Sequence, residues 1–198
     1  MIDNFEKIRD LLVFESDDDF YYLQILQRKK ENPELGSNSR VIKNYYIRSV
    51  DYLDKKKEEI INLCNQFNAR ASIRLNRRSF IKVAFKTQIN ISNQMMNRDF
   101  LNVSKAYDRA CGQSSNEDKK NKKWIIDVDE EFSESLFNII EGFTIGVNPN
   151  INQSKVVTTI PSKSGFHVIT TPFDLRNWKS QLPNLDIHKD NPTNLYIP

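Results

Sequence analysis

The sequence predicts an α+β (mixed α/β) fold, because helix-like and strand-like segments are interspersed along its 198 residues. Apolar residues recur at helical spacing in several segments, most clearly in 49–68 and 80–96. Short runs of β-branched and aromatic residues, such as 20–28 and 156–160, are typical of strands. A hydrophobic content of 38%, with 12 Phe and 7 Tyr, is enough to build a core around them.

Helices and strands are expected to follow one another in the first half. They are a helix over 3–14, strands over 20–28 and 41–47, a helix over 49–68 that Ser49 caps, a strand over 69–75, and helices over 80–96 and 100–111. Segment 112–123 is polar and lysine-rich without an apolar period, which indicates a loop between two subdomains. We therefore predict one domain, 1–198, made of an N-terminal α/β subdomain (1–118) and a second subdomain (119–198).

The second half is expected to begin with a strand and to contain a hairpin. Its predicted elements are a strand over 124–129, a helix over 131–141 that stops at Gly142, strands over 156–160 and 166–171, a helix over 173–182, and a closing segment over 186–197. The turn between the two hairpin strands would lie at the functional end.

The location and charge of the chain follow from composition. No apolar run approaches the about 20 residues of a membrane span, and the first residues lack the character of a signal peptide, so we expect a cytoplasmic protein without a membrane partner. Cys64 and Cys111 are far apart, which indicates reduced thiols. The net charge is only +3. A basic cluster suits a polyanionic partner, although solvated surface charge explains it equally well; its candidate residues are Arg74, Arg77, Arg78 and Lys82.

Two carboxylates end the predicted strand 124–129. Alternate side chains of a strand share a face, so Asp127 and Asp129 would point the same way. Side-by-side carboxylates repel each other without a cation, and Mg²⁺ or Mn²⁺ prefers oxygen ligands of this kind. The pair therefore predicts a metal site, with helix capping as the structural alternative.

The predicted hairpin turn offers groups that hold phosphate oxygens. Ser162 and Ser164 supply hydroxyls, Lys163 supplies an ammonium, and Gly165 permits a close backbone approach. His167 follows at once in the next strand, as a phosphate partner, a base or a structural hydrogen-bonding residue. Order and spacing favour one combined metal and phosphate site.

The residues quoted so far are similar to a known family. Ile125-Ile-Asp-Val-Asp129, Gly165-Phe-His167 and Asn184-Leu-Asp186 resemble the three motifs of the archaeo-eukaryotic primase (primase-polymerase) superfamily. The resemblance covers roughly 124–198, and Asn194 stands where that superfamily often has a basic residue. It implies an N-terminal α/β unit packed on an RRM-like catalytic half.

The resemblance also implies a function. It implies a phage or mobile-element nucleotidyltransferase that acts in DNA replication with Mg²⁺ or Mn²⁺. Such an enzyme joins NTP or dNTP on a single-stranded DNA or RNA template, and its expected partner is a helicase or other replication protein. The implied catalytic residues are Asp127, Asp129, Asp186 and His167, of which the three aspartates ligate the metal. The implied nucleotide-binding residues are Ser162, Lys163, Ser164, Gly165 and His167. On charge alone, the candidates for contact with the template are Arg74, Arg77, Arg78 and Lys82.

Alternatives remain open at the level of sequence. The chain could instead be a non-catalytic, RRM-like protein that binds single-stranded nucleic acid. It could also be a metal-dependent phosphoesterase or nuclease that uses His167 and His188 with the same carboxylates. Should Asp186 lie elsewhere, Asp174 and Asp190 are the alternative third ligands.

Overall fold

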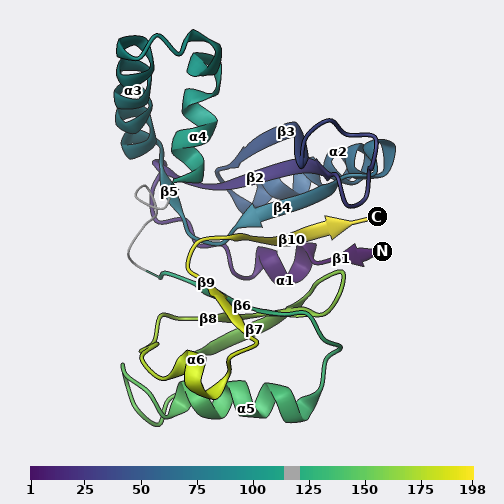
Figure 1. Ribbon diagram of the computed structural model, residues 1–198, viewed down its shortest axis with the longest axis vertical. Coiled ribbons are helices and arrows are strands. Elements are labelled where there is room, and N and C mark those ends of the chain that lie inside the picture. The colour runs from purple at the N-terminus through teal and green to yellow at the C-terminus, as the bar shows by residue number, and fades with distance from the viewer. Residues whose placement is uncertain (114–120) are drawn as a thin grey trace.

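Two antiparallel sheets and their helices form the protein, which confirms the predicted α+β class (Figure 1). The structure is a computed structural model and describes residues 1–113 and 121–198. The predicted subdomain boundary at residue 118 lies outside the described residues. No helix in the described ranges is long and apolar enough to span a membrane.

The larger sheet is built almost entirely from the first half of the chain. Its elements and their neighbours are β1 (Ile2–Asp3), α1 (Phe5–Arg9), β2 (Asp19–Arg28), β3 (Ser39–Ile47), α2 (Val50–Phe67), β4 (Arg70–Arg74), β5 (Arg78–Ser79), α3 (Phe80–Met96), the 3₁₀ helix η1 (Phe100–Lys105) and α4 (Ala106–Gly112). Among the described strands the order is β1-β10-β4-β2-β3, and β5 pairs with one end of β2.

Strand β2 shows how the sequence places helices on both faces of this sheet. Tyr21, Leu23 and Ile25 point to one face and join the core formed with α1 and α2. Phe20 and Tyr22 point to the other face and pack with residues of α3 and α4. The helical pair α3–α4 projects from this end of the sheet (Figure 1).

The smaller sheet lies in the second half of the chain. Its elements are β6 (Trp124–Val128), α5 (Glu134–Ile145), β7 (Val156–Pro161), β8 (Phe166–Thr170), α6 (Trp178–Gln181) and β9 (Asp186–His188), and β10 (Pro192–Ile197) follows. Within the described residues the strand order is β7-β8-β6-β9. A strand–helix–strand–strand–helix–strand succession in this order is a split βαβ arrangement.

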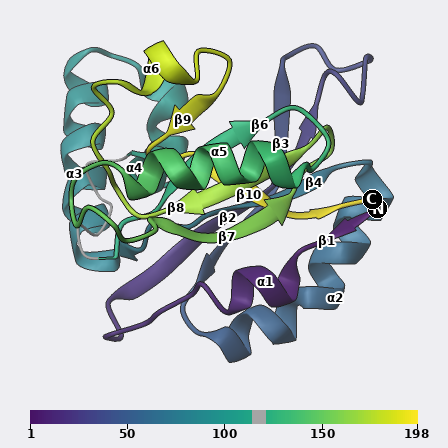
Figure 2. The ribbon, with the colours of Figure 1, turned by 90° about the horizontal axis from the view of Figure 1, so that it is seen from below.

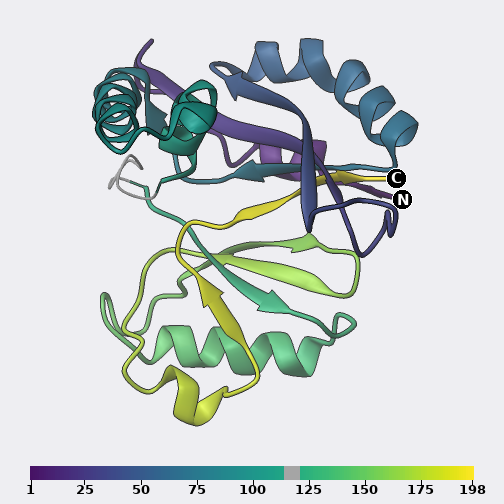
Figure 3. The ribbon, with the colours of Figure 1, turned by 45° about the horizontal axis from the view of Figure 1, so that its top comes forward.

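The two faces of the smaller sheet have different neighbours. Ile126, Val128 and Val168 form a core beneath α5, which lies across the strands (Figure 2). Ile125 and Ile169 point the opposite way and join the core of the larger sheet. The sheets therefore lie one above the other, with α2 and α5 on the outside (Figure 3).

Strand β10 departs from the predicted division of the chain. The closing segment was assigned to the second subdomain, but 192–197 pairs with β4 and β1 inside the larger sheet. The C-terminus thereby completes the sheet that the N-terminus begins. The two halves are consequently tied together by a shared strand.

Local hydrogen bonds from polar side chains set several helix ends, and two of the helices differ from prediction there. Ser49 caps α2 as expected, by accepting a hydrogen bond from the Tyr52 backbone N–H at 3.0 Å. Ser133 caps α5, which starts later than predicted and continues through Gly142 to Ile145. The predicted helix over 173–182 is reduced to Trp178–Gln181 because Asp174 binds the Arg176 backbone N–H in a local turn.

Candidate functional site

The antiparallel pairing of three strands places the predicted site residues in one row. Asp127 on β6 lies directly opposite His167 on β8 and, on its other side, opposite Asp186 on β9. Directly opposed residues in antiparallel strands project on the same face. The row faces away from α5, on the side of the smaller sheet that adjoins the larger one.

Asp127 is flanked by two imidazoles. Its Oδ1 lies 3.3 Å from His167 Nε2, and its Oδ2 lies 3.8 Å from His188 Nε2. The hydrogen bond with His167 lowers the pKa of Asp127 against the opposing effect of burial, so the carboxylate is ionised at neutral pH. This makes Asp127 a ready ligand for a cation.

A second contact fixes the ring of His167. Its Nδ1 lies 2.7 Å from Oγ1 of Thr193, a fully buried residue of β10. A hydrogen bond at one ring nitrogen fixes the ring orientation and leaves the other nitrogen for function. Thr193 is far away in the sequence, and sequence reasoning did not identify it.

The hairpin turn packs against the end of β6. The Ser162 backbone N–H donates to the Gly165 carbonyl at 2.9 Å, and the Ser164 hydroxyl donates to Asp129 Oδ1 at 2.8 Å. A Cβ atom at Gly165 would clash with the Val128 carbonyl oxygen and lie 2.6 Å from that of Glu130. Glycine at this position therefore lets the turn approach the strand that carries the aspartates. This packing explains the glycine without any contact with phosphate.

Lys163 is held by a residue that the sequence analysis missed. Its Nζ lies 2.8 Å from Oε1 of Glu31, which also accepts hydrogen bonds from the Arg70 guanidinium. Burial alone would raise the pKa of Glu31, but the bonds from Arg70 and Lys163 outweigh it and lower the pKa below its ordinary value. Glu31 follows β2 and Arg70 lies on β4, so only the fold brings this cluster together.

These groups surround a polar hollow of about 720 Å³ between the sheets, which we call the site hollow. The smaller sheet and its turn contribute Asp127, Asp129, His167, His188 and the predicted phosphate-binding residues 162–164. The larger sheet and the loop after its strand β2 contribute cations and polar groups, among them Arg28, Lys30, Arg70, Ser72 and Asn194. Carboxylates and cations therefore both line the hollow, and each of the two sheets contributes some of them.

Asp186 shares the row of Asp127 but is turned away from the hollow. Its side chain is 70% exposed, and Lys179 Nζ lies 2.7 Å from its Oδ1. The hydrogen bond from Lys179 lowers the pKa of this carboxyl. The alternative ligands lie elsewhere, because Asp174 pairs with Arg176 and Asp190 pairs with buried Arg78.

The donor set for a metal is therefore incomplete as it stands. In the part of the chain that the structure describes, no group of three His, Cys, Asp or Glu residues is arranged to hold a metal ion. Asp127 and Asp129 offer the hard oxygen ligands that Mg²⁺ and Mn²⁺ take. Asp186 has the right register to join them if it exchanges Lys179 for the metal.

The predicted nucleic-acid contacts at Arg77 and Arg78 are wrong. Arg78 is fully buried and binds Asp190 at 2.6 Å, while Arg77 binds Glu15 at 3.0 Å and Asp19 at 3.1 Å. These guanidiniums hold the fold together, because a charge can be buried only with partners.

The other two predicted contacts fare differently. Arg74 is largely buried and lies 3.3 Å from Asp190 Oδ2, so its charge is also used inside the fold. Lys82 alone is exposed, on α3. The local charge of the sequence could not separate these cases, because the carboxylate partner Asp190 lies more than a hundred residues away.

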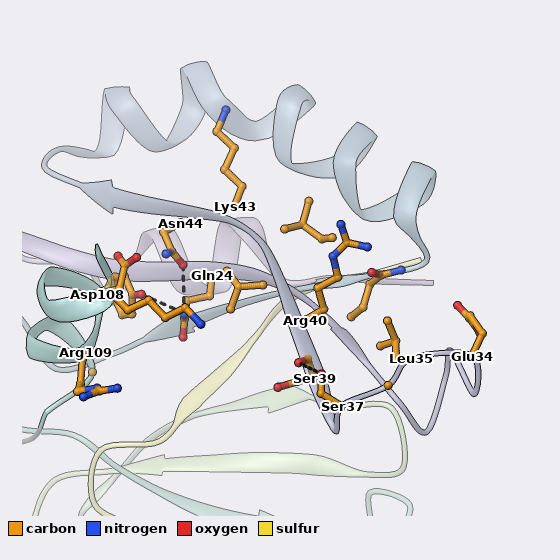
Figure 4. Close-up of a pocket in the computed structure, with 17 residues that line it drawn as sticks. Gln24, Glu34, Leu35, Ser37, Ser39, Arg40, Lys43, Asn44, Asp108 and Arg109 are labelled. Carbon is orange, nitrogen blue, oxygen red and sulfur yellow. Dashed lines mark hydrogen bonds between the residues drawn. The ribbon is translucent and has the colours of Figure 1, made fainter. Parts of the chain in front are cut away.

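A larger hollow of about 1160 Å³ opens on the larger sheet beside α4, and we call it the outer hollow (Figure 4). Its floor is polar, since Gln24 donates to Tyr22 Oη at 3.0 Å and to Asn44 Oδ1 at 3.1 Å. Arg40, Lys105 and Arg109 line it without an ion pair to a carboxylate of the described residues. It contains none of the predicted site residues.

Comparison of the chain with family models, curated proteins and solved structures finds no match. The function is therefore inferred from the geometry of the two hollows and the residues that line them.

Proposed function

We propose that the protein is a metal-dependent nucleotidyltransferase of the primase-polymerase type that acts in cytoplasmic DNA replication. The observation that carries the proposal is the row of Asp127, His167 and Asp186 on neighbouring strands. All three resemblance motifs then meet at one face of one sheet. Three motifs from separate parts of the chain have no structural need to fall in register, so their alignment favours a shared role.

The carboxylates would form the metal-binding side of the site. We infer that Asp127 and Asp129 hold Mg²⁺ or Mn²⁺, with Asp186 as the third ligand. When bound, the metal would neutralise phosphate charge and activate the attacking hydroxyl. The lowered pKa of Asp127 supports this role because it keeps the carboxylate charged.

The hairpin turn and the neighbouring part of the larger sheet would bind the triphosphate of an NTP or dNTP. Lys163 and Arg70 meet at Glu31 beside the hollow, and Ser164 lies at its rim with Asp129. We infer that incoming phosphates take Lys163 from Glu31, since an exposed lysine can rotate while Arg70 remains paired. His167, oriented by Thr193, would donate from Nε2 to a phosphate oxygen in place of Asp127, which would bind the metal instead.

The nucleic-acid strand requires a basic surface other than Arg77 and Arg78. The outer hollow supplies one, with Arg40 and Arg109 on its walls and amide groups on its floor (Figure 4). Amides can hydrogen-bond base edges, and guanidiniums can bind phosphates. The loop after β2 contributes Glu31 to the site hollow and Ser37 to the outer hollow, so the two adjoin the same segment.

Incorporation of labelled nucleotides on a single-stranded template with Mn²⁺ tests the proposal. We expect Asp127→Asn and Asp129→Asn to reduce incorporation by about a hundredfold or more, because each removes charge that stabilises the transition state. Both variants should also weaken Mn²⁺ binding measured by calorimetry. Asp54→Asn, an exposed carboxylate paired with Arg9 on the surface, is the matched control and should change neither quantity.

Strand binding gives a second readout on the same protein. Arg40→Glu and Arg109→Glu should weaken binding of a single strand and reduce its salt dependence, with log K changing by about 0.7 less per decade of salt for each lost phosphate contact. Nucleotide and Mn²⁺ binding should stay unchanged. Full incorporation by both aspartate variants would exclude the proposed activity.

One alternative activity has an observation in its favour. His167 and His188 approach Asp127 from two sides, an arrangement that also suits a metal-dependent phosphoesterase or nuclease. Cleavage of the labelled strand without extension, lost in His188→Ala, would select that activity. Metal-independent strand binding that both aspartate variants retain would instead select the non-catalytic RRM-like binding protein.

A further inference from the structure

An apolar surface that the fold leaves uncovered runs along α3 and η1. Seven of the fourteen large hydrophobic residues that are exposed among the described residues lie between Ile81 and Leu101, with exposed fractions between 52% and 91%. Monomeric proteins rarely gather exposed apolar groups in this way without an interaction partner. The α3–α4 pair projects from the larger sheet, so this surface is accessible (Figures 1 and 3).

Four exposed residues of α3 form a straight stripe on the side of the helix opposite its buried residues: Ile81, Phe85, Ile89 and Met96. We call this surface the α3 stripe. At about 100° per residue, Phe85 and Ile89 lie about 40° and 80° around the helix from Ile81. The buried residues Val83 and Gln94 lie at about 200° and 220° on the same scale. Met96 returns to about 60°, so the α3 stripe extends over about 22 Å, or four turns.

The charged side chains that α3 itself carries are all cations, and the neighbouring carboxylates Asp18 and Asp99 lie only at its two ends. Lys82 and Lys86 lie at about 100° and 140°, along one border of the stripe. Neither has an ion pair with a carboxylate of the described residues, and Arg98 follows the helix. The sequence from Phe80 to Arg98 contains no Asp or Glu. A partner that covers this surface therefore has to bring the negative charge.

We propose that the α3 stripe is a docking site for an amphipathic helix of a partner protein whose apolar face is bordered by Asp and Glu. Apolar residues four positions apart form ridges that pack into the grooves of a second helix. Carboxylates beside the partner's apolar face would then meet Lys82 and Lys86. A second copy of this chain is a poor occupant, because the border of its own α3 stripe carries Lys82 and Lys86 and not the carboxylates that these lysines would need.

Peptide binding to the full chain tests the proposal. The probe is a fluorescein-labelled helical peptide of about four to five turns with Leu on one face and Glu beside it, and its matched control carries Lys in place of Glu. We expect fluorescence anisotropy to show at least tenfold tighter binding of the Glu peptide. Phe85→Ser should weaken binding at least tenfold, whereas Ile139→Ser, an equally exposed apolar residue on α5, should not.

Reversing the charge of the two lysines, light scattering and vesicle binding together show whether a partner helix, a second copy of the chain or a membrane covers the α3 stripe. Lys82→Glu with Lys86→Glu should reverse the preference in favour of the Lys peptide. Equal or absent binding of the two peptides, or binding that survives Phe85→Ser, overturns the proposal. A dimer in light scattering that Phe85→Ser abolishes, or capture of the protein by phosphatidylserine-containing vesicles through the same residue, also overturns it. The α3 stripe lies outside both hollows, so none of these outcomes depends on nucleotidyl transfer.

Discussion

Glu31 binds two cations with one buried carboxylate, and this contact joins the hairpin turn to the larger sheet. Its side chain is only 8% exposed, and Arg70 is buried beside it. A buried charge of this kind is tolerated because its partners satisfy it. Lys163 is the exposed member of the cluster. It can move away from Glu31 without leaving a buried charge unpaired, because Glu31 keeps its contact with Arg70.

Replacing Glu31 by Gln should destabilise the protein by about 3 kcal/mol at neutral pH, because it leaves Arg70 buried without its counter-charge. The pKa of Glu31 is lowered by folding, so its contribution is present above the ordinary value of 4.5 and is lost as pH falls through the folded pKa. The stability of Glu31→Gln should therefore fall less steeply than that of wild type below pH 4.5. Urea denaturation at a series of pH values measures both effects.

The surface pair Arg9–Asp54 supplies the control for Glu31. Both side chains are more than 40% exposed, so Asp54→Asn should change stability by less than about 1 kcal/mol. Equal effects of the two substitutions would mean that the Glu31 cluster contributes no more to stability than an exposed ion pair.

The sequence could predict the residues of the site that lie close to one another in the chain. Asp127 and Asp129 share a strand, and His167 follows its turn directly, so periodicity places them. Glu31 and Thr193 could not be predicted, because they reach the site from other strands through long-range pairing. Asp186 was expected near Asp127 only from the family resemblance, and its contact with Lys179 depends on a side-chain direction that spacing does not determine.

Among the elements, the β7–β8 hairpin depends on a single glycine. Its turn lies so close to the end of β6 that the backbone atoms of Val128 and Glu130 occupy the place of a Cβ atom at Gly165. The approach also positions Ser164 beside Asp129. The turn and the carboxylates are therefore fixed relative to each other by backbone packing.

Gly165→Ala should shift the turn or the end of β6 and cost about 1–3 kcal/mol, the usual cost of overpacking. The matched control is Gly142→Ala, within α5, where a Cβ atom meets nothing within 4 Å. That substitution should stabilise the protein by about 0.5–1 kcal/mol, since glycine is unfavourable inside a helix. Thermal denaturation compares them, and a stable Gly165→Ala protein would contradict the packing argument.

The predictability of the elements follows from how much local sequence determines them. Helix α3 occupies its predicted range, 80–96, because apolar spacing and the cap Ser79 mark it. Gly142 was wrongly taken as the end of α5, since a glycine on an exposed helix face costs too little to stop a helix that its neighbours stabilise. Local sequence also gave no sign that 192–197 would pair with the larger sheet.

At the scale of the whole molecule, β10 and Asp190 connect the two halves. Asp190 precedes β10 and accepts hydrogen bonds from Arg74, Asn76 and Arg78, all of which lie in or beside the larger sheet. Ile125 and Ile169 of the smaller sheet belong to the core of the larger one. The halves therefore share a strand, a buried ion pair and part of a core.

This sharing predicts that the protein unfolds as one cooperative unit. The two tryptophans, Trp124 and Trp178, report on the core beneath α5, whereas six of the seven tyrosines precede residue 113 and report on the larger sheet and its helices. Their urea transitions should coincide, as expected for a two-state protein. Asp190→Asn should lower the free energy of unfolding by about 3 kcal/mol, because it leaves Arg78 buried without its charge partner. Both transitions should therefore move together to lower urea concentration. Separate transitions, or a shift of one probe alone, would show that the halves fold independently and that β10 adds little to their connection.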